Sequence, residues 1–471
     1  MKKIVILGLA LALVGGVAYA NYCARDNVPA ATLLVPYAVV DLSPLTGTPD
    51  PAGYTTLFAV TNVSSSAEIV HFTVWDAQSN HVVDWDELLT GYDVWTINFR
   101  DLLTGSFNVF DTGIDVLDPG PVGGPPPYGP TSNSFTTTLT APEDPAVPIG
   151  GCNFPYGSLP SLGPIIVQKL QAAIVAQTEQ DTTTDGCKPG ATPTNPPWLA
   201  GLSATSRVFF YVTADVVNAC STSFPDQSAY WSTTGTNPLT GAGFTGLPAD
   251  RNVLVGDIIY VNFTTNFSES IPAVALEASP NAKIPGFLAF YDRYANPNFQ
   301  DDREPLATAF AFRYINAGAS TEVMVWKDHS EADYTDTGIT DACLPYVYYA
   351  FDENENAQAR GGGGPSGFDV AQPNVIPFET QSAPMNGSNW QGLPAPNGWM
   401  MLVFDPSVPV ITPLLNQAWV GVRYLSAGYS TSLEAATLAN VNCFTNQVLP
   451  GLGINTNSWN GGFPTAYPYL P

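Results

Sequence analysis

The chain has 471 residues, with 15 Lys and Arg against 41 Asp and Glu, and its formal net charge is −26. Proteins that bind nucleic acid carry clustered basic residues, so a chain this acidic, whose few basic residues are scattered, excludes nucleic acid as a partner. Hydrophobic residues make up 45% of the chain and charged residues only 12%, which predicts a large core beneath an uncharged polar surface.

The first twenty residues have the pattern of a secretory signal peptide. Two lysines precede an apolar run from Ile4 to Val17, and Ala18-Tyr19-Ala20 offers the small residues that a signal peptidase accepts. The sequence therefore predicts a signal peptide over 1–20 and a secreted protein, extracellular or on the cell surface, with the periplasm as the alternative location. No later stretch approaches the roughly twenty apolar residues of a membrane-spanning helix, so no transmembrane segment is expected.

All six cysteines follow the predicted leader. An even number of cysteines in an exported chain predicts disulfides, and none of these cysteines has the close spacing of a zinc site. The pairing stays open, although a bridge from Cys152 to Cys187 is favoured because it would close a proline-rich segment and stabilise the fold by about 3–4 kcal/mol. The predicted disulfide cysteines are Cys23, Cys152, Cys187, Cys220, Cys343 and Cys443.

The body of the chain consists of short runs rich in β-branched and aromatic residues, separated by 43 Pro and 41 Gly. Many strands joined by turns predict an all-β fold of disulfide-stapled β-sandwich units, Ig-like or jelly-roll-like. One short helix is expected over 164–178, where apolar residues recur at helical spacing. The predicted strands are 33–40, 55–62, 68–75, 94–99, 208–214, 257–263, 273–278, 286–291, 308–315, 322–326, 346–351, 399–404 and 419–424.

A run of Pro and Gly over 119–130 cannot pair inside a sheet and predicts an extended connector. The sequence therefore predicts an N-terminal β-domain over 21–118 and a larger β-sandwich region over 131–471, which includes the helix.

Two segments of the chain resemble each other. Thr56–Val60 followed by Thr73–Asp76 is similar to Thr308–Phe312 followed by Val323–Asp328, and the spacing from Phe to Trp is 17 residues in one and 16 in the other. The similarity favours two related halves in which each segment forms a hairpin. Chance similarity between two unrelated hairpins is the alternative, because hairpins generally share this pattern.

Only three histidines could support catalysis. His71 lies in an alternating strand and His81 follows a turn, so both are interpreted as structural, and the nucleophile motif Gly-x-Ser-x-Gly is absent. Among the carboxylates, Glu277 and Glu304 are the best placed for glycoside hydrolysis, which needs a facing pair. Each is explained as well by a strand end, with Glu304 beside Arg303, and the two are expected not to share a groove. The sequence thus predicts no catalytic residue.

Acidic loops are the candidate cation sites, because clustered carboxylates suit calcium. Asp328 and Asp333 flank His329 in one loop, and Asp352 and Glu353 open another. Neither loop matches the EF-hand pattern, and a solvated acidic turn is the alternative for both. Trp75, Trp85 and Trp95 recur every ten residues beside aspartates and could stack on sugars, although tryptophan in strands more often belongs to a core.

Several segments together resemble a family of exported bacterial β-rich proteins with no established activity. The resemblance covers most of the chain after the leader and implies a single exported unit, without implying a substrate. The segments that carry it are Leu34–Tyr37, Asp41, Thr55–Phe58, Thr61–Asn62, Leu89–Asp93, Asn252–Asp257, Leu276–Ala278, Asp302–Leu306, Phe378–Gln381, Gly398–Trp399 and Gln417–Val420.

The sequence as a whole predicts a non-catalytic secreted or cell-surface protein that acts by binding or assembly, and not an enzyme. One alternative is a secreted carbohydrate-active enzyme that uses paired carboxylates, and another is a calcium-stabilised glycan-binding module. The expected partners are a glycan or another cell-surface component, or further copies of the same chain. No cofactor other than calcium is expected.

Overall fold

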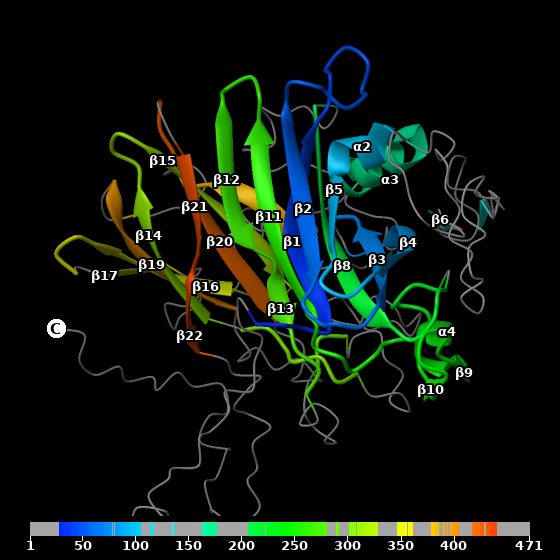
Figure 1. The fold of residues 1–471 in the computed structure, drawn as a ribbon. Coiled ribbons are helices and arrows are strands. Elements are labelled where there is room, and N and C mark those ends of the chain that lie inside the picture. The colour runs from blue at the N-terminus through cyan, green and yellow to red at the C-terminus, as the bar shows by residue number, and fades with distance from the viewer. Residues whose placement is uncertain are drawn as a thin grey trace, which may run out of the picture.

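The computed structural model describes residues 28–77, 79, 81–104, 114–115, 134–135, 163–176, 206–221, 223–279, 289–291, 301–307, 309–327, 346–355, 357–360, 378–385, 390, 393, 396–404, 417–427 and 430–439. Across these residues the chain is mostly β, and every strand pairing is antiparallel (Figure 1). The all-β class predicted from the sequence is confirmed. None of the helices in this part of the chain is long and apolar enough to span a membrane.

The strands form two units, each built from two facing sheets. The first unit contains β1 (Thr32–Asp41), β2 (Tyr54–Asn62), β3 (Glu68–Trp75), β4 (His81–Leu89), β5 (Val94–Asn98), β6 (Ile114–Asp115), β7 (Ser134–Phe135), β8 (Arg207–Val217), β9 (Thr234–Thr236), β10 (Gly243–Thr245), β11 (Leu254–Asn262), β12 (Phe267–Pro272) and β13 (Val274–Leu276), with helices α2 (Phe99–Thr104), α3 (Gly163–Ala176) and α4 (Ser228–Ser232). The second unit contains β14 (Ala309–Ile315), β15 (Ser320–Lys327), β16 (Tyr346–Asp352), β17 (Ala357–Arg360), β18 (Thr380–Pro384), β19 (Asn397–Phe404), β20 (Ala418–Leu425), β21 (Ser430–Glu434) and β22 (Ala436–Ala439).

We number the four large sheets I to IV. Sheet I has the strand order β12-β11-β2-β5, and sheet II has the order β13-β1-β8-β3-β4-β6-β7. In the second unit, sheet III has the order β18-β15-β20-β21, and sheet IV has the order β17-β16-β19-β14-β22. Strands β9 and β10 form a separate pair.

The sheets stack in the order I, II, III, IV, and sheet III also meets an edge of sheet I, where β21 lies beside β12. Phe58 of sheet I contacts Phe72 of sheet II, with ring centroids 6.4 Å apart. On the other face of sheet II, Tyr211 contacts Trp326 of sheet III at 5.8 Å. Trp326 therefore belongs to the core of the first unit, whereas its neighbour Val325 packs in a second core between sheets III and IV.

Burial along the strands follows this stacking. All eight residues of β3 in sheet II are buried, because layers cover both faces of that sheet. In sheet I, β11 alternates between buried and more exposed residues, as expected for a sheet with one face packed on a core. An inner strand is therefore buried along its whole length, whereas the burial of an outer strand alternates.

The two units have the same topology. We assign positions a to i, in chain order, to β1, β2, β3, β4, β5, β8, β11, β12 and β13 of the first unit and to β14 through β22 of the second. Sheets II and IV then both have the order i-a-f-c-d, and sheets I and III both have the order h-g-b-e. The additional strands of the first unit extend sheet II beyond position d or form the β9–β10 pair.

This shared topology corrects the interpretation of the repeated segments as hairpins. Strands β2 and β3 do not pair with each other, because they lie in sheets I and II, and β14 and β15 likewise lie in sheets IV and III. The two segments are also out of step, since β2 occupies position b and β14 occupies position a. The sequence similarity therefore does not mark equivalent strands.

The sheets also cross the predicted connector. Strands β1 and β3 precede residues 119–130, yet both pair with β8, which follows them. No division between sheets falls at that segment, and in the described residues the change of unit comes between β13 and β14.

Most predicted elements are found close to their expected bounds. The helix expected over 164–178 is α3, and the strand expected over 68–75 is β3. Helices α2 and α4 were not expected, nor was β4. Of the strand expected over 286–291 only residues 289–291 are described, and they include a turn.

Candidate functional site

A buried carboxylate on β8 gathers hydroxyl side chains from three other segments of the chain. Asp215 is fully buried, and it accepts hydrogen bonds from the hydroxyls of Tyr230 and Tyr291, each at 2.9 Å. It also accepts one from the hydroxyl of Thr32 on β1. An ionised carboxylate only accepts hydrogen bonds, so three hydroxyl donors satisfy its demand inside the core. Burial and the charge of Asp215 raise the pKa of both tyrosines well above the usual value, which keeps them as donors.

His71 lies beside this carboxylate cluster and carries a positive charge. Its Nδ1 lies 2.8 Å from Asp86, and its Nε2 lies 3.5 Å from Asp84. Burial alone would lower the pKa of His71, but the charges of Asp86, Asp84 and Asp215 together raise it to about 9. An imidazolium that stays charged at neutral pH and is fully buried balances the aspartates of β4, which fits the structural role expected from the sequence.

His81 and His329 complete the set of histidines. The Nδ1 of His81 contacts Asp226, and its ring stacks on Phe224 with centroids 4.0 Å apart. This places His81 against the loop before α4. His329 lies outside the described residues.

The segment that leads into the second unit carries a second buried charge cluster. The Nη1 of Arg303 lies 2.7 Å from Asp302 and 3.9 Å from Asp301, and its Nε donates to Thr32 at 3.0 Å. Arg303 thus pairs with the two aspartates before it, whereas the sequence suggested Glu304 as its partner. Through Thr32, it connects this segment to the Asp215 cluster.

Glu277 and Glu304 are brought together by a short antiparallel bridge. Ala278 pairs with Arg303, and the amide of Glu304 donates to the carbonyl of Glu277 at 2.9 Å, so the two glutamates lie directly opposite each other. Side chains at opposite positions share one face, with Cβ atoms about 4.5–5.5 Å apart. Glu304 is buried and Glu277 is half-buried. No sequence pattern indicated this pairing, and the expectation that the two residues do not share a groove stays a prediction.

A third cluster joins the two units, and we call it the Arg423 junction. Arg423 on β20 is buried, and its Nε donates to Glu269 of β12, while its Nη1 lies 3.1 Å from Glu322 of β15. The guanidinium also lies over the ring of Tyr260, 4.9 Å from its centroid. Figure 1 shows β12 and β21 side by side at this boundary. Burial, opposed by Arg423, raises the pKa of Glu269 to about 7.

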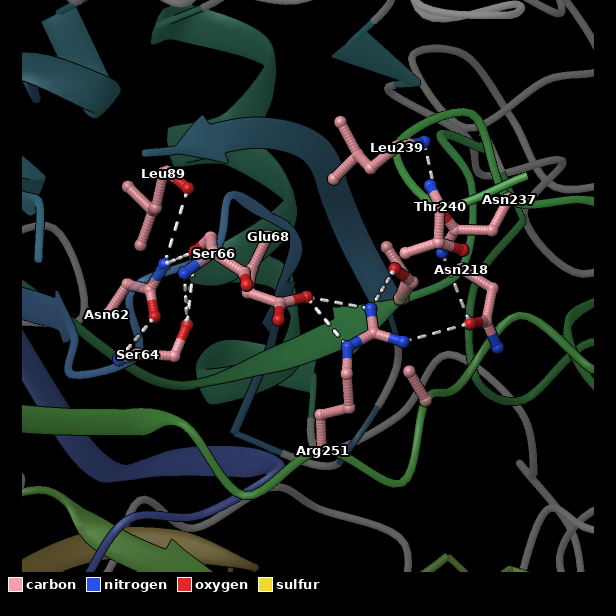
Figure 2. A network of polar contacts seen from close by, with 12 residues as sticks. Asn62, Ser64, Ser66, Glu68, Leu89, Asn218, Asn237, Leu239, Thr240 and Arg251 are labelled. Carbon is pink, nitrogen blue, oxygen red and sulfur yellow. Dashed lines mark hydrogen bonds and ion pairs between the residues drawn. The ribbon is translucent and has the colours of Figure 1, made fainter. Parts of the chain in front are cut away.

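A more accessible polar network lies at one end of the first unit (Figure 2). The guanidinium of Arg251 lies 2.7 Å from Glu68, and its Nη1 donates to Asn218 at 3.3 Å. The side chain of Arg251 is 33% exposed, whereas that of Glu68 is 5% exposed. Nearby, the amide of Asn62 donates to the carbonyls of Ser66 and Leu89 and so joins two turns. This network orders loops at the surface and leaves one cationic side chain within reach of solvent.

The predicted calcium ligands fall in two places. Asp328 and Asp333 lie outside the described residues. Asp352 accepts the amide of Asn354 at 2.8 Å, and Glu353 pairs with Arg313 across two exposed side chains. Among the described residues, no group of three or more His, Cys, Asp or Glu side chains is arranged to hold a metal ion.

The remaining sequence candidates are aromatic residues and cysteines. Trp75 and Trp85 are fully buried, so the alternative of sugar stacking by these two is wrong. Trp95 packs on Phe72 in the same core, with centroids 4.6 Å apart. Of the six cysteines only Cys220 lies in the described residues, where it carries no free thiol.

Sequence reasoning missed the centres of the two largest clusters. Asp215 and Arg423 each stand at a strand position among apolar neighbours, where a single charge has no motif to mark it. Comparison with known proteins adds no assignment, since no family model, no curated protein and no solved structure matches the chain.

Proposed function

We propose that this is an exported, non-catalytic protein that acts outside the cytoplasm by binding or assembly. The observation that supports it most is where the ionisable side chains lie. Asp215, His71, Arg303 and Arg423 are all buried and are held by partners from other strands or loops. Such groups hold layers together and are shielded from a substrate, whereas catalysis needs groups that reach one.

The signal-peptide pattern and the even cysteine count support the location outside the cytoplasm. Export through a signal peptidase would leave Asn21 as the first residue, and oxidising conditions would pair all six cysteines. Intact mass under non-reducing alkylation tests both points together. A mature chain that keeps its leader or that takes up alkylating reagent in stoichiometric amount contradicts the proposal.

One observation favours a second candidate, a secreted carbohydrate-active enzyme. Glu277 and Glu304 are cross-strand neighbours, and glycosidases use two carboxyl groups roughly 5–10 Å apart. Glu304 is 8% exposed. In the first proposal the same pair is a structural part of the segment that joins the units.

A hydrolysis assay separates the two candidates. Purified mature protein is incubated with a panel of polysaccharides, beside Glu277→Gln, Glu304→Gln and the control Glu353→Gln, whose side chain is exposed. We expect no reducing ends to form and a lower unfolding midpoint for Glu304→Gln alone. Hydrolysis that both pair variants abolish, at an unchanged midpoint, replaces the proposed function by the enzymatic one.

A glycan array tests the binding form of the proposal. We expect retention of a glycan that persists when a chelator is added. Retention that a chelator removes and calcium restores would instead identify the calcium-stabilised glycan-binding module.

A further inference from the structure

The junction between the two units joins unlike faces. The outward face of sheet II, with Phe209 and Tyr211, packs on Trp326 of sheet III and on Phe378, which lies just before β18. At one edge of this junction β21 of sheet III also lies beside β12 of sheet I. Sheet II has the strand order i-a-f-c-d and sheet III has the order h-g-b-e. Contact between two different faces is heterologous, and a heterologous contact that repeats does not close on itself unless its rotation makes a ring.

Each end of the stack carries the counterpart of one of these faces. Sheet I, at one end, has the same h-g-b-e order as sheet III, and sheet IV, at the other end, has the same i-a-f-c-d order as sheet II. Inside the chain, a face of each kind is covered by a face of the other kind. The two end sheets therefore offer one face of each kind to a second copy.

The outward face of sheet I carries partly buried apolar residues among mostly uncharged polar ones. Phe58 and Ile258 point into the core, so their neighbours Leu57 and Ile259, which pair across β2 and β11, point outward. Both are half-exposed, and so are Val255 and Val261 on the same face. Along β2, β11, β12 and β5 the outward positions carry one charged residue, Asp257, in a chain with 41 acidic residues.

The outward face of sheet IV also carries apolar residues. Met400 and Leu402 point into the second core, so Trp399 and Met401 of β19 point outward, and both are half-exposed. Trp399 stacks on Phe351 of β16, with ring centroids 3.8 Å apart. At the edge of this aromatic surface lies Arg313, which is 60% exposed and pairs with Glu353.

We propose that copies of this chain stack head to tail, with sheet I of one copy on sheet IV of the next, repeating the contact of sheets II and III. This inference rests on the proposed function, which it deepens by naming a second copy as the partner. The strands of sheet I have 9, 9, 6 and 5 residues, and at about 3.4 Å per residue and about 4.8 Å between strands they cover about 470 Å². That area is below the roughly 800 Å² per partner of a standard interface, so the assembly is weak and depends on concentration.

Sedimentation velocity on the mature protein over a wide concentration range tests the stacking. We expect the sedimentation coefficient of the wild type to rise with concentration. Ile259→Glu on sheet I and Met401→Glu on sheet IV should each weaken association at least about tenfold. Leu45→Glu is the matched control, because it adds the same charge at a residue that is 94% exposed in a turn outside both faces, and it should behave as the wild type.

A mixture of the two variants shows which faces meet. Ile259→Glu keeps an intact sheet IV, and Met401→Glu keeps an intact sheet I, so an equimolar mixture should form dimers and nothing longer. Self-association of Met401→Glu alone would mean that sheet I pairs with itself, and it would overturn the head-to-tail contact. Circular dichroism verifies that each variant is folded, and Thr61→Glu on the same face replaces Ile259→Glu if that variant is not.

Different results would contradict the stacking of chains and the proposed function. A wild type that stays monomeric at every concentration, without hydrolytic activity, removes the stacking and leaves a non-catalytic protein. Hydrolytic activity that depends on Glu277 and Glu304 removes the proposed function whether or not the chains stack.

Discussion

The two units share one strand order, but their equivalent strands are buried to different extents. Position f is β8 in the first unit and β19 in the second, and both strands lie in the middle of an i-a-f-c-d sheet. From Val208 to Val217, β8 is buried at every residue, because sheets I and III cover both of its faces. Strand β19 alternates, with Met400 and Leu402 buried and Met401 half-exposed. The burial pattern of a strand therefore reports the layers above and below it more than its place in the topology.

The equivalent strands of the two units also differ in whether they carry a charged side chain. On the doubly covered β8, Asp215 is satisfied by donors from other elements, and on β19 the outward positions carry Trp399 and Met401 instead. A carboxylate is retained inside the protein only where partners surround it, because an unpaired buried charge costs several kcal/mol. The first unit can hold a polar network between its layers, and the second has no layer on that side in the described residues.

The largest expected effect comes from breaking the contact between the units at the Arg423 junction. Arg423→Ala leaves the buried Glu269 and the partly buried Glu322 without their shared cation, which should cost about 3–5 kcal/mol of unfolding free energy. Calorimetry should then resolve two transitions, since the junction is one of the contacts through which the units unfold together.

The matched control for this variant is Arg313→Ala. Arg313 pairs with Glu353 at the surface, and such pairs contribute about 0.5 kcal/mol or less. Equal losses in the two variants, or a single transition for Arg423→Ala, would show that the junction does not couple the units.

The next effect is a pH dependence located at the same junction. Two carboxylates share one guanidinium, and the pKa of Glu269 is raised from 4.5 to about 7. The folded state then binds a proton that the unfolded state releases, so the contribution of Glu269 to stability is full below pH 4.5 and is lost as the pH rises to about 7. Glu269→Gln should remove a pH dependence of up to about 3 kcal/mol across this window.

His71 gives an internal reference for that measurement. Its pKa is raised from 6.5 to about 9, so its contribution is full below pH 6.5 and is lost between pH 6.5 and 9. Denaturant titrations at closely spaced pH values should show only the upper window in Glu269→Gln, and both windows in the exposed control Glu353→Gln. A lower window that survives in Glu269→Gln would assign it to another group.

The sequence predicted apolar strands well, but it missed strand segments that contain aspartate, and both misses have the same physical reason. The prediction ended a strand at Ala214, because aspartate is rare in strands, yet β8 continues through Asp215 to Val217. Strand β4 was missed for the same reason, since Asp84 and Asp86 lie within it. In both cases compensating donors come from segments distant in sequence, such as Thr32 for Asp215 and the amide of Ser221 for Asp86. Local patterns carry no information about such partners, and they also hid the shared strand order of the two units.

The smallest effect tests whether the two units are equivalent at their first connection, from position a to position b. Gly47 lies between β1 and β2 with a φ of +68°, and Gly318 lies between β14 and β15 with a φ of +81°. A Cβ at either residue would meet nothing within 4 Å, so the cost of Ala is the left-handed backbone alone. We expect Gly47→Ala and Gly318→Ala each to lose about 1 kcal/mol in chemical denaturation, and the Asn variants to lose less, because Asn tolerates this conformation.

Gly243→Ala is the control, since its φ is not positive and the nearest atom lies 3.8 Å away, and it should change stability by less than about 0.5 kcal/mol. Unequal losses of stability at Gly47 and Gly318 would show that the two connections are not equivalent, although both have a left-handed glycine.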